Sequence, residues 1–132
     1  MLLEKENLLT RKIIGYCFEI HTKIGTGFEE KIYVRALVEK FKLNQISYET
    51  EKPYPVIFEN VKVGLKRLDL VIEDRIILEI KSIKGKMLTI FRNQLLTYLK
   101  ISRLKVGLLI NFGNNRCEVK RLLNDPPIRV IR

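Results

Sequence analysis

The chain has 132 residues, of which 46% are hydrophobic and 30% charged, and its formal net charge is +10. This length and composition predict a single domain, residues 1–132, with one core, and exclude a disordered chain. The 25 Lys and Arg residues outnumber the 15 Asp and Glu residues, which favours a polyanionic partner, most often nucleic acid. No apolar run of about 18 residues and no signal-peptide pattern occurs, so we expect a cytoplasmic protein without a membrane partner.

The cysteines and the single histidine do not indicate a metal site. Cys17 and Cys117 lie in separate apolar-periodic segments with no CxxC or Cys/His cluster. Buried free thiols are therefore expected in place of a disulfide or a zinc site. His21 has no second histidine and no evident nucleophile, so we interpret it as structural.

The first part of the chain predicts two helices. Apolar side chains spaced by three and four mark one face of a helix from Glu4 to Ile24; they are Leu9, Ile13, Cys17, Ile20 and Ile24. Gly25-Thr26-Gly27 ends this helix. Thr26 followed by Glu29 matches a capping box, which predicts Thr26 as the N-cap of a second helix that runs to about Phe41.

Glu30 differs from its neighbour Glu29 because the capping box gives it no local function. In a helix it shares a mostly apolar stripe with Tyr33, Val34 and Leu37. A carboxylate on such a stripe needs a partner, either a basic residue or a metal ion. Taken alone, this position is more often a glutamate at the edge of a helix than a metal ligand.

A β-hairpin is predicted from Val63 to Ser82. Before it, Ile46 to Phe58 alternates loosely and contains Pro53 and Pro55, which indicates an edge strand with a break. In the hairpin, two runs rich in Val, Ile and Leu flank the polar residues Glu73-Asp74-Arg75.

Centring the hairpin on Asp74 places Asp69 opposite Glu79 and Arg67 opposite Lys81, all on one face of the sheet. The other face is then continuously apolar; its residues are Leu68, Leu70, Ile72, Ile76, Leu78 and Ile80.

Two directly opposed carboxylates destabilise a sheet unless something compensates their charge. A hard divalent cation such as Mg²⁺ would do so, because it binds carboxylate oxygens together with waters and substrate phosphates. Lys81 would then stand beside the ion, able to position or deprotonate a water or to neutralise a phosphate. The alternative is an exposed, solvated sheet face on which Arg67 and Lys81 pair with the acids.

The remaining segments predict a helix and two strands. The helix spans about Leu88 to Ile101, with an apolar stripe and an adjoining polar pair, Gln94 and Tyr98. Strands are predicted at 106–112 and 117–122, and no element is assigned to 124–132. The order of elements predicts an α/β or α+β fold, a central mixed sheet flanked by helices. The apolar tail and the exposed edge near Pro53 leave a homodimer open.

Four blocks of this sequence together resemble a known family. Asp69 and Glu79-Ile80-Lys81 resemble the D…(D/E)xK core of the PD-(D/E)XK nucleases, which have the restriction-endonuclease-like fold. Residues 27–33, GFEEKIY, match the GxxExxY signature of one family within that superfamily. Residues 64–69 match its glycine, arginine and aspartate pattern, and Gln94 with Tyr98 matches a QxxxY helix. Leu68 stands where the superfamily name has proline.

The resemblance implies a metal-dependent nuclease, most often acting on DNA, that uses Mg²⁺ with Mn²⁺ as a substitute. It implies that Glu30, Asp69 and Glu79 surround the metal, that Lys81 assists the water and that Gln94 orients the phosphate or the lysine. The expected supporting residues are Tyr98, Arg67 and Tyr33. Residues expected to bind the nucleic-acid backbone are Lys84, Lys86, Arg92, Arg103 and Lys105. Non-catalytic nucleic-acid-binding and protein-interaction modules that keep the fold are the alternatives.

Overall fold

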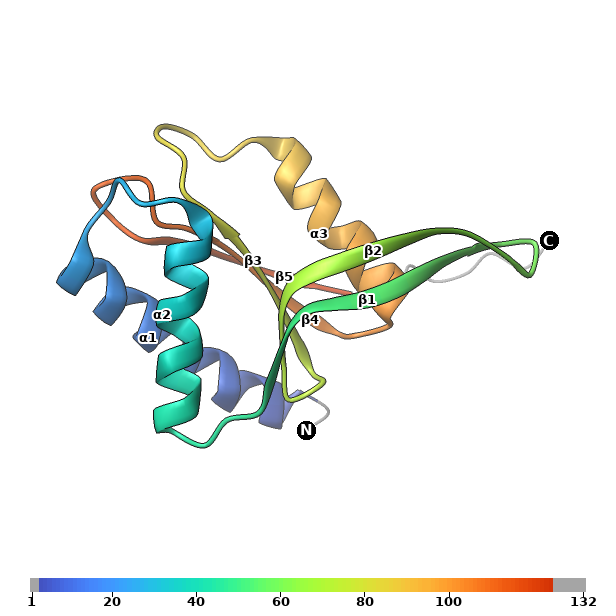
Figure 1. Ribbon diagram of the computed structural model, residues 1–132, viewed down its shortest axis with the longest axis horizontal. Coiled ribbons are helices and arrows are strands. Elements are labelled where there is room, and N and C mark those ends of the chain that lie inside the picture. The colour runs from blue at the N-terminus through green and yellow to red at the C-terminus, as the bar shows by residue number, and fades with distance from the viewer. Residues whose placement is uncertain (1–2, 125–132) are drawn as a thin grey trace.

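The computed structural model describes residues 3–124, which form three helices and five strands (Figure 1). The helices are α1 (Glu4–Ile24), α2 (Glu30–Leu43) and α3 (Thr89–Ser102). The strands are β1 (Tyr48–Phe58), β2 (Val61–Ile72), β3 (Ile76–Lys81), β4 (Val106–Asn111) and β5 (Glu118–Leu123).

The five strands form one mixed sheet in the order β1-β2-β3-β4-β5. Neighbouring strands are antiparallel except β3 and β4, which are parallel and are connected through α3. A parallel pair requires such a crossover because its strands must start at the same edge. β3 and β4 are the most buried strands, since helices cover the sheet on both faces.

Each face of the sheet carries its own apolar cluster. α1 and α2 pack through residues such as Ile13, Tyr33 and Leu37 against one face. α3 packs through Leu95 and Leu99 against the other face. The predicted α+β fold with a central mixed sheet flanked by helices is therefore confirmed, and it is consistent with a restriction-endonuclease-like core.

The capping box predicted at Thr26 is wrong. α2 begins at Glu30, its N-cap is Glu29, and no side chain caps it. Gly27 has φ of +98°, a conformation that glycine adopts readily, and it holds the preceding loop out of the helix. Glu29 instead lies near Lys31, with 3.6 Å between its Oε1 and the lysine Nζ.

The central hairpin has the predicted register but separates early. Leu70 pairs with Leu78, Val71 with Ile77 and Ile72 with Ile76, and the regular pairing ends there. Arg67 therefore does not lie opposite Lys81; its partner is Pro53 on β1. The strands diverge because β2 continues along β1 while β3 continues along β4.

One residue of the predicted apolar face, Leu68, lies on the other face of the sheet. Leu70 lies in the cluster under α1 and α2, whereas Leu68 lies in the cluster under α3. Tyr48 and Tyr54 on β1 divide in the same way between the two clusters. Since residues two apart share a face in a regular strand, both strands turn over between these positions.

Other expectations concern single residues. Cys17 is buried and Cys117 half-buried, and both are free thiols. His21 Nε2 lies 2.8 Å from the Asn114 carbonyl oxygen and its ring stacks on Phe112, a structural environment. Ile24, expected on the inner face of α1, is exposed.

The last two expectations concern the apolar C-terminal tail and membrane-spanning helices. The apolar tail that left a dimer open lies outside the described residues. In the described part of the chain, no helix is long and apolar enough to cross a membrane.

Candidate active site

The divergence of β2 and β3 creates a fork in the sheet, and Asp69 lies in it. The Ile80 backbone N–H, which has no β2 partner in the regular ladder, donates a hydrogen bond of 3.1 Å to Asp69 Oδ2. The aspartate side chain thus satisfies a donor that the diverging strand leaves free. This contact fixes one carboxylate oxygen of Asp69 against β3, next to Glu79.

Glu79 lies on β3 with only 6% of its surface exposed. Burial and, next in size, the charge of the neighbouring Asp69 carboxylate raise the pKa of Glu79 to about 8, against the opposing charge of Lys81. Burial also raises the pKa of Asp69, against the hydrogen bond from Ile80 and the charge of Lys81. Without a cation, the pair therefore resists carrying two negative charges, and the folded protein favours the protonated form of Glu79.

The sequence left open that Arg67 and Lys81 pair with these acids. Within residues 3–124, neither Asp69 nor Glu79 forms a salt bridge. The Lys81 ammonium lies 4.3 Å from the centre of the Phe91 ring on α3, a cation–π contact. Arg67 is exposed on β2. The alternative in which Arg67 and Lys81 form ion pairs with the two acids is therefore not the arrangement in the structure.

Glu30 is the first residue of α2 and is exposed, not turned inward as its stripe suggested. It lines one cavity with Asp69, and its charge raises the pKa of Glu79. Tyr33, one turn further along α2, is buried and donates a hydrogen bond of 2.6 Å to the Gly25 carbonyl. It holds the loop from which Glu30 emerges.

Tyr33 is itself fixed by an aromatic stack, since the centre of its ring lies 4.3 Å from the centre of the Phe112 ring. The same loop is tied to the end of β3, where the Ser82 hydroxyl donates a hydrogen bond of 2.6 Å to the Phe28 carbonyl. These contacts keep the start of α2 beside the strand that carries Glu79 and Lys81.

Glu51 is a site residue that the sequence did not indicate. It lies within β1 with φ of +50°, unusual for a non-glycine residue in a strand. It stands between the pairs Thr50–Leu70 and Lys52–Leu68, at the level of Asp69, where the ladder skips a pair. Glu51 lines the same cavity of about 320 Å³ as Glu30 and Asp69, and its charge raises the pKa of Asp69.

Of the two predicted residues of α3, only Tyr98 is influenced by the carboxylates. Tyr98 is half-buried, and burial followed by the charges of Glu79 and Asp69 raises the pKa of its hydroxyl. Gln94 lies one turn earlier on the same side of the helix and is exposed. The structure gives it no contact with the acids.

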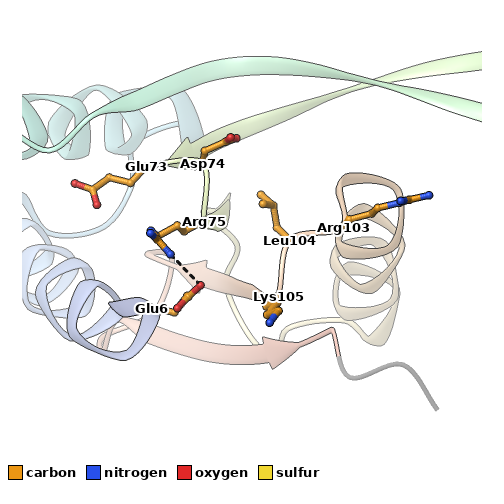
Figure 2. A pocket seen from close by; sticks show the side chains of 7 residues that line it. All are labelled: Glu6, Glu73, Asp74, Arg75, Arg103, Leu104 and Lys105. Atoms are coloured by element: carbon orange, nitrogen blue, oxygen red, sulfur yellow. Dashed lines mark hydrogen bonds and ion pairs between the residues drawn. The ribbon is translucent and has the colours of Figure 1, made fainter. Parts of the chain in front are cut away.

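The five basic residues expected to bind phosphates do not form one surface. Lys84, Lys86 and Arg92 are exposed in the loop after β3 and at the start of α3. Arg103 and Lys105 lie beyond the other end of α3, a 14-residue helix about 21 Å long. Figure 2 shows them around a cavity of about 400 Å³ whose other lining residues include Glu6, Glu73 and Asp74.

The donor set at the fork fits a hard divalent cation. Asp69 and Glu79 supply carboxylate oxygens, and such an ion would stabilise the ionised form of Glu79 that burial and Asp69 disfavour. No group of three or more His, Cys, Asp or Glu side chains within residues 3–124 is arranged to hold a metal. An ion here would therefore take its remaining ligands from water and substrate oxygens, which Mg²⁺ readily accepts.

Comparisons with known proteins agree with this geometry. The family model described as the PD-(D/E)XK nuclease superfamily matches residues 7–122. The chain belongs to this nuclease superfamily. The residues predicted for the D…(D/E)xK motif, Asp69 and Glu79-Ile80-Lys81, lie within the matched range, at the fork between β2 and β3.

Among solved structures, the chain is similar to the crystal structure of SSO0001, with 26% sequence identity and a TM-score of 0.56. The likeness covers 70% of this chain and 48% of the other, so the chain spans about half the length of that protein. No curated protein matches the sequence.

Proposed function

We propose that this chain is a metal-dependent nuclease that hydrolyses phosphodiester bonds in DNA, and that it belongs to the GxxExxY family of its superfamily. The observation that carries the proposal is the buried Glu79 carboxylate, which lies beside Asp69 with no salt-bridge partner in the described residues. A nuclease fold that keeps an uncompensated acid pair at its sheet fork retains the charge for a cation.

In this proposal Asp69 and Glu79 are the direct metal ligands. When bound, Mg²⁺ or Mn²⁺ would polarise the phosphodiester and lower the pKa of a coordinated water. Ile80 N–H keeps one Asp69 oxygen in place, which leaves the other oxygen of that carboxylate for the metal. Glu30 and Glu51, which line the cavity, would hold water molecules around the ion through their carboxylates.

Lys81 is proposed to deliver or accept a proton at the attacking water. Its ammonium lies over the Phe91 ring, and a rotation of the flexible side chain would carry it from the ring to the acids. Gln94 and Tyr98, one turn apart on one side of α3, are proposed to orient the phosphate; the charges of Glu79 and Asp69 raise the pKa of Tyr98, which supports its part in this role. Tyr33 acts at a distance by fixing the loop before Glu30.

The phosphates flanking the cleaved bond are proposed to meet Lys84, Lys86 and Arg92, which are exposed near the Lys81 end of β3. Arg103 and Lys105 are left out of this surface because acidic residues share their cavity (Figure 2).

Cleavage assays test the proposal directly. Purified protein is incubated with linear, circular and single-stranded DNA and with RNA, in Mg²⁺, in Mn²⁺ or in EDTA. Metal-dependent products are expected from DNA. Lys81→Met, which keeps an unbranched apolar stem but removes the amine, should reduce the rate by about 100-fold or more. The matched control is Lys100→Met, at an exposed position of α3.

A thermal titration separates the alternatives. Millimolar Mg²⁺ or Mn²⁺ should raise the thermal midpoint, because a ligand that binds only the folded state stabilises it by mass action. A midpoint that rises without any cleaved strand would indicate a binding module that keeps the fold. Absence of both the shift and the products would remove the metal centre and the nuclease together.

A further inference from the structure

The β1–β2 hairpin extends well beyond the rest of the sheet (Figure 1). β2 pairs with β3 only from Leu70 to Ile72, whereas it pairs with β1 from Val61 to Ile72. Residues 53–67, hereafter the arm, are therefore a ribbon of only two strands. An isolated two-stranded ribbon is marginally stable in water, so its length requires an explanation.

The root of the arm is anchored beside the candidate active site. Tyr54 packs against the cluster under α3, as does Leu68 just before Asp69. The faces of both strands change near Glu51 and Asp69, just before the arm begins. A bulge between Val56 and Ile57 adds further twist near its tip.

The outer part of the arm is apolar and exposed. Large hydrophobic side chains there have 40–63% of their surface exposed; they are Ile57, Phe58, Val61, Val63 and Leu65. Single exposed hydrophobic residues are ordinary on a protein surface, but a group on one projecting element indicates an interaction site.

The charge of the arm selects the kind of partner. Three basic residues, Lys62, Lys66 and Arg67, stand against one acidic residue, Glu59. None of the four forms a salt bridge within the described part of the chain. Two copies of a basic arm repel each other, and Pro53 and Pro55 remove backbone donors that strand pairing between copies would use. A polyanion with apolar surfaces is the complementary partner.

The arm also has the right reach. Arg67 is two residues from Asp69, and Val61 is eight residues from it, about 26 Å along the strand. This corresponds to about eight base pairs of duplex. A nucleic acid with a phosphate at the fork would therefore pass the root of the arm and come within reach of its tip.

We propose that the arm is a nucleic-acid clamp. Lys62, Lys66 and Arg67 bind backbone phosphates, and the apolar tip packs on the faces of unstacked bases, as apolar wedges do in proteins that kink DNA. The preferred ligand is thus DNA with unpaired or easily unstacked bases near the cleaved bond. The inference rests on the proposed function, since it assumes DNA at the fork.

The test compares the tip with an equally exposed apolar position elsewhere. Phe58 and Val61 are cross-strand partners, and Phe58→Ser/Val61→Ser removes the centre of the tip. Leu43→Ser is the control, because Leu43 is 76% exposed at the far end of α2. Binding is measured by fluorescence anisotropy in Ca²⁺, with a labelled 30-base-pair duplex and the same duplex carrying three central unpaired bases.

The double variant should bind the unpaired substrate at least about tenfold more weakly, with a smaller loss on the perfect duplex. Leu43→Ser should bind both like the parent protein. Arg67→Ala should lower the salt slope of binding by about one. Circular dichroism and the thermal midpoint establish that each variant is folded.

Equal affinities of the double variant and Leu43→Ser would overturn the clamp. So would a parent dimer that the double variant converts to a monomer without a change in DNA affinity, which would assign the tip to a second copy. The nuclease proposal fails separately: a parent protein that binds DNA through the arm but never cuts it would keep the clamp and lose the nuclease.

Discussion

Two glutamates lie buried near opposite ends of β3: Glu6 on α1 is 8% exposed and Glu79 is 6% exposed. Arg75, in the turn before β3, places its Nη1 atom 3.5 Å from the Glu6 carboxylate (Figure 2). Glu79 has a second carboxylate as its neighbour instead. The two glutamates therefore differ in what compensates their charge. Arg75 of the protein itself pairs with Glu6, whereas an ionised Glu79 requires an external cation.

The largest expected difference between the two glutamates is in the rate of DNA cleavage. Glu79→Gln should lower metal-dependent cleavage by about 100-fold or more, because it removes an anionic oxygen ligand while keeping the shape of the side chain. Glu6→Gln should leave the rate unchanged. Both rates are measured on the same DNA substrate in Mg²⁺, and equal losses in the two variants would contradict the assignment.

The second effect is on the stability of the metal-free protein, and its sign differs between the two glutamates. The raised pKa of Glu79 means that the folded state holds this proton more tightly than the unfolded chain does. The stability contributed by the protonated form is therefore lost as pH rises from about 4.5 to about 8. Glu79→Gln should raise stability at pH 8, by a few kcal/mol, and change it little near pH 5.

Glu6→Gln should instead lower stability, by about 1 kcal/mol, since Arg75 then loses its partner. Urea unfolding in EDTA at pH 5, 6.5 and 8 measures both variants. A Glu79→Gln protein that is less stable than the parent at pH 8 would show that the protein compensates this charge after all.

The smallest effect concerns Glu51, which also faces Asp69. Glu51→Gly should stabilise the metal-free protein by up to about 1 kcal/mol, because glycine adopts φ of +50° without strain. Glu49→Gly, two residues earlier in the same strand, is the control and should destabilise it. The Mg²⁺-induced rise in thermal midpoint should be smaller in Glu51→Gly than in the parent, and an unchanged rise would remove Glu51 from the metal environment.

Much of the fold could be predicted because it depends on short-range patterns. The hairpin register follows from alternation about a polar turn, and Ile72 indeed pairs with Ile76 across Glu73, Asp74 and Arg75. The span of α1 follows from helical periodicity. The capping box failed because Gly27 holds the loop before α2 in a conformation that a spacing of residue types does not reveal.

Residue type and spacing were enough to predict the elements, the mixed fold class and the candidate acids, since these patterns act within one strand or helix. The separation of β2 and β3 at Asp69, the turn of Leu68 to the other face and the place of Glu51 in the cavity became known from the tertiary structure. It also showed that Lys81 rests on Phe91 and leaves Glu79 without a salt bridge in the described chain. These features depend on how β1 and β4 pair with the two strands of the hairpin and on how α3 packs against them. Such long-range contacts leave no local pattern in the sequence.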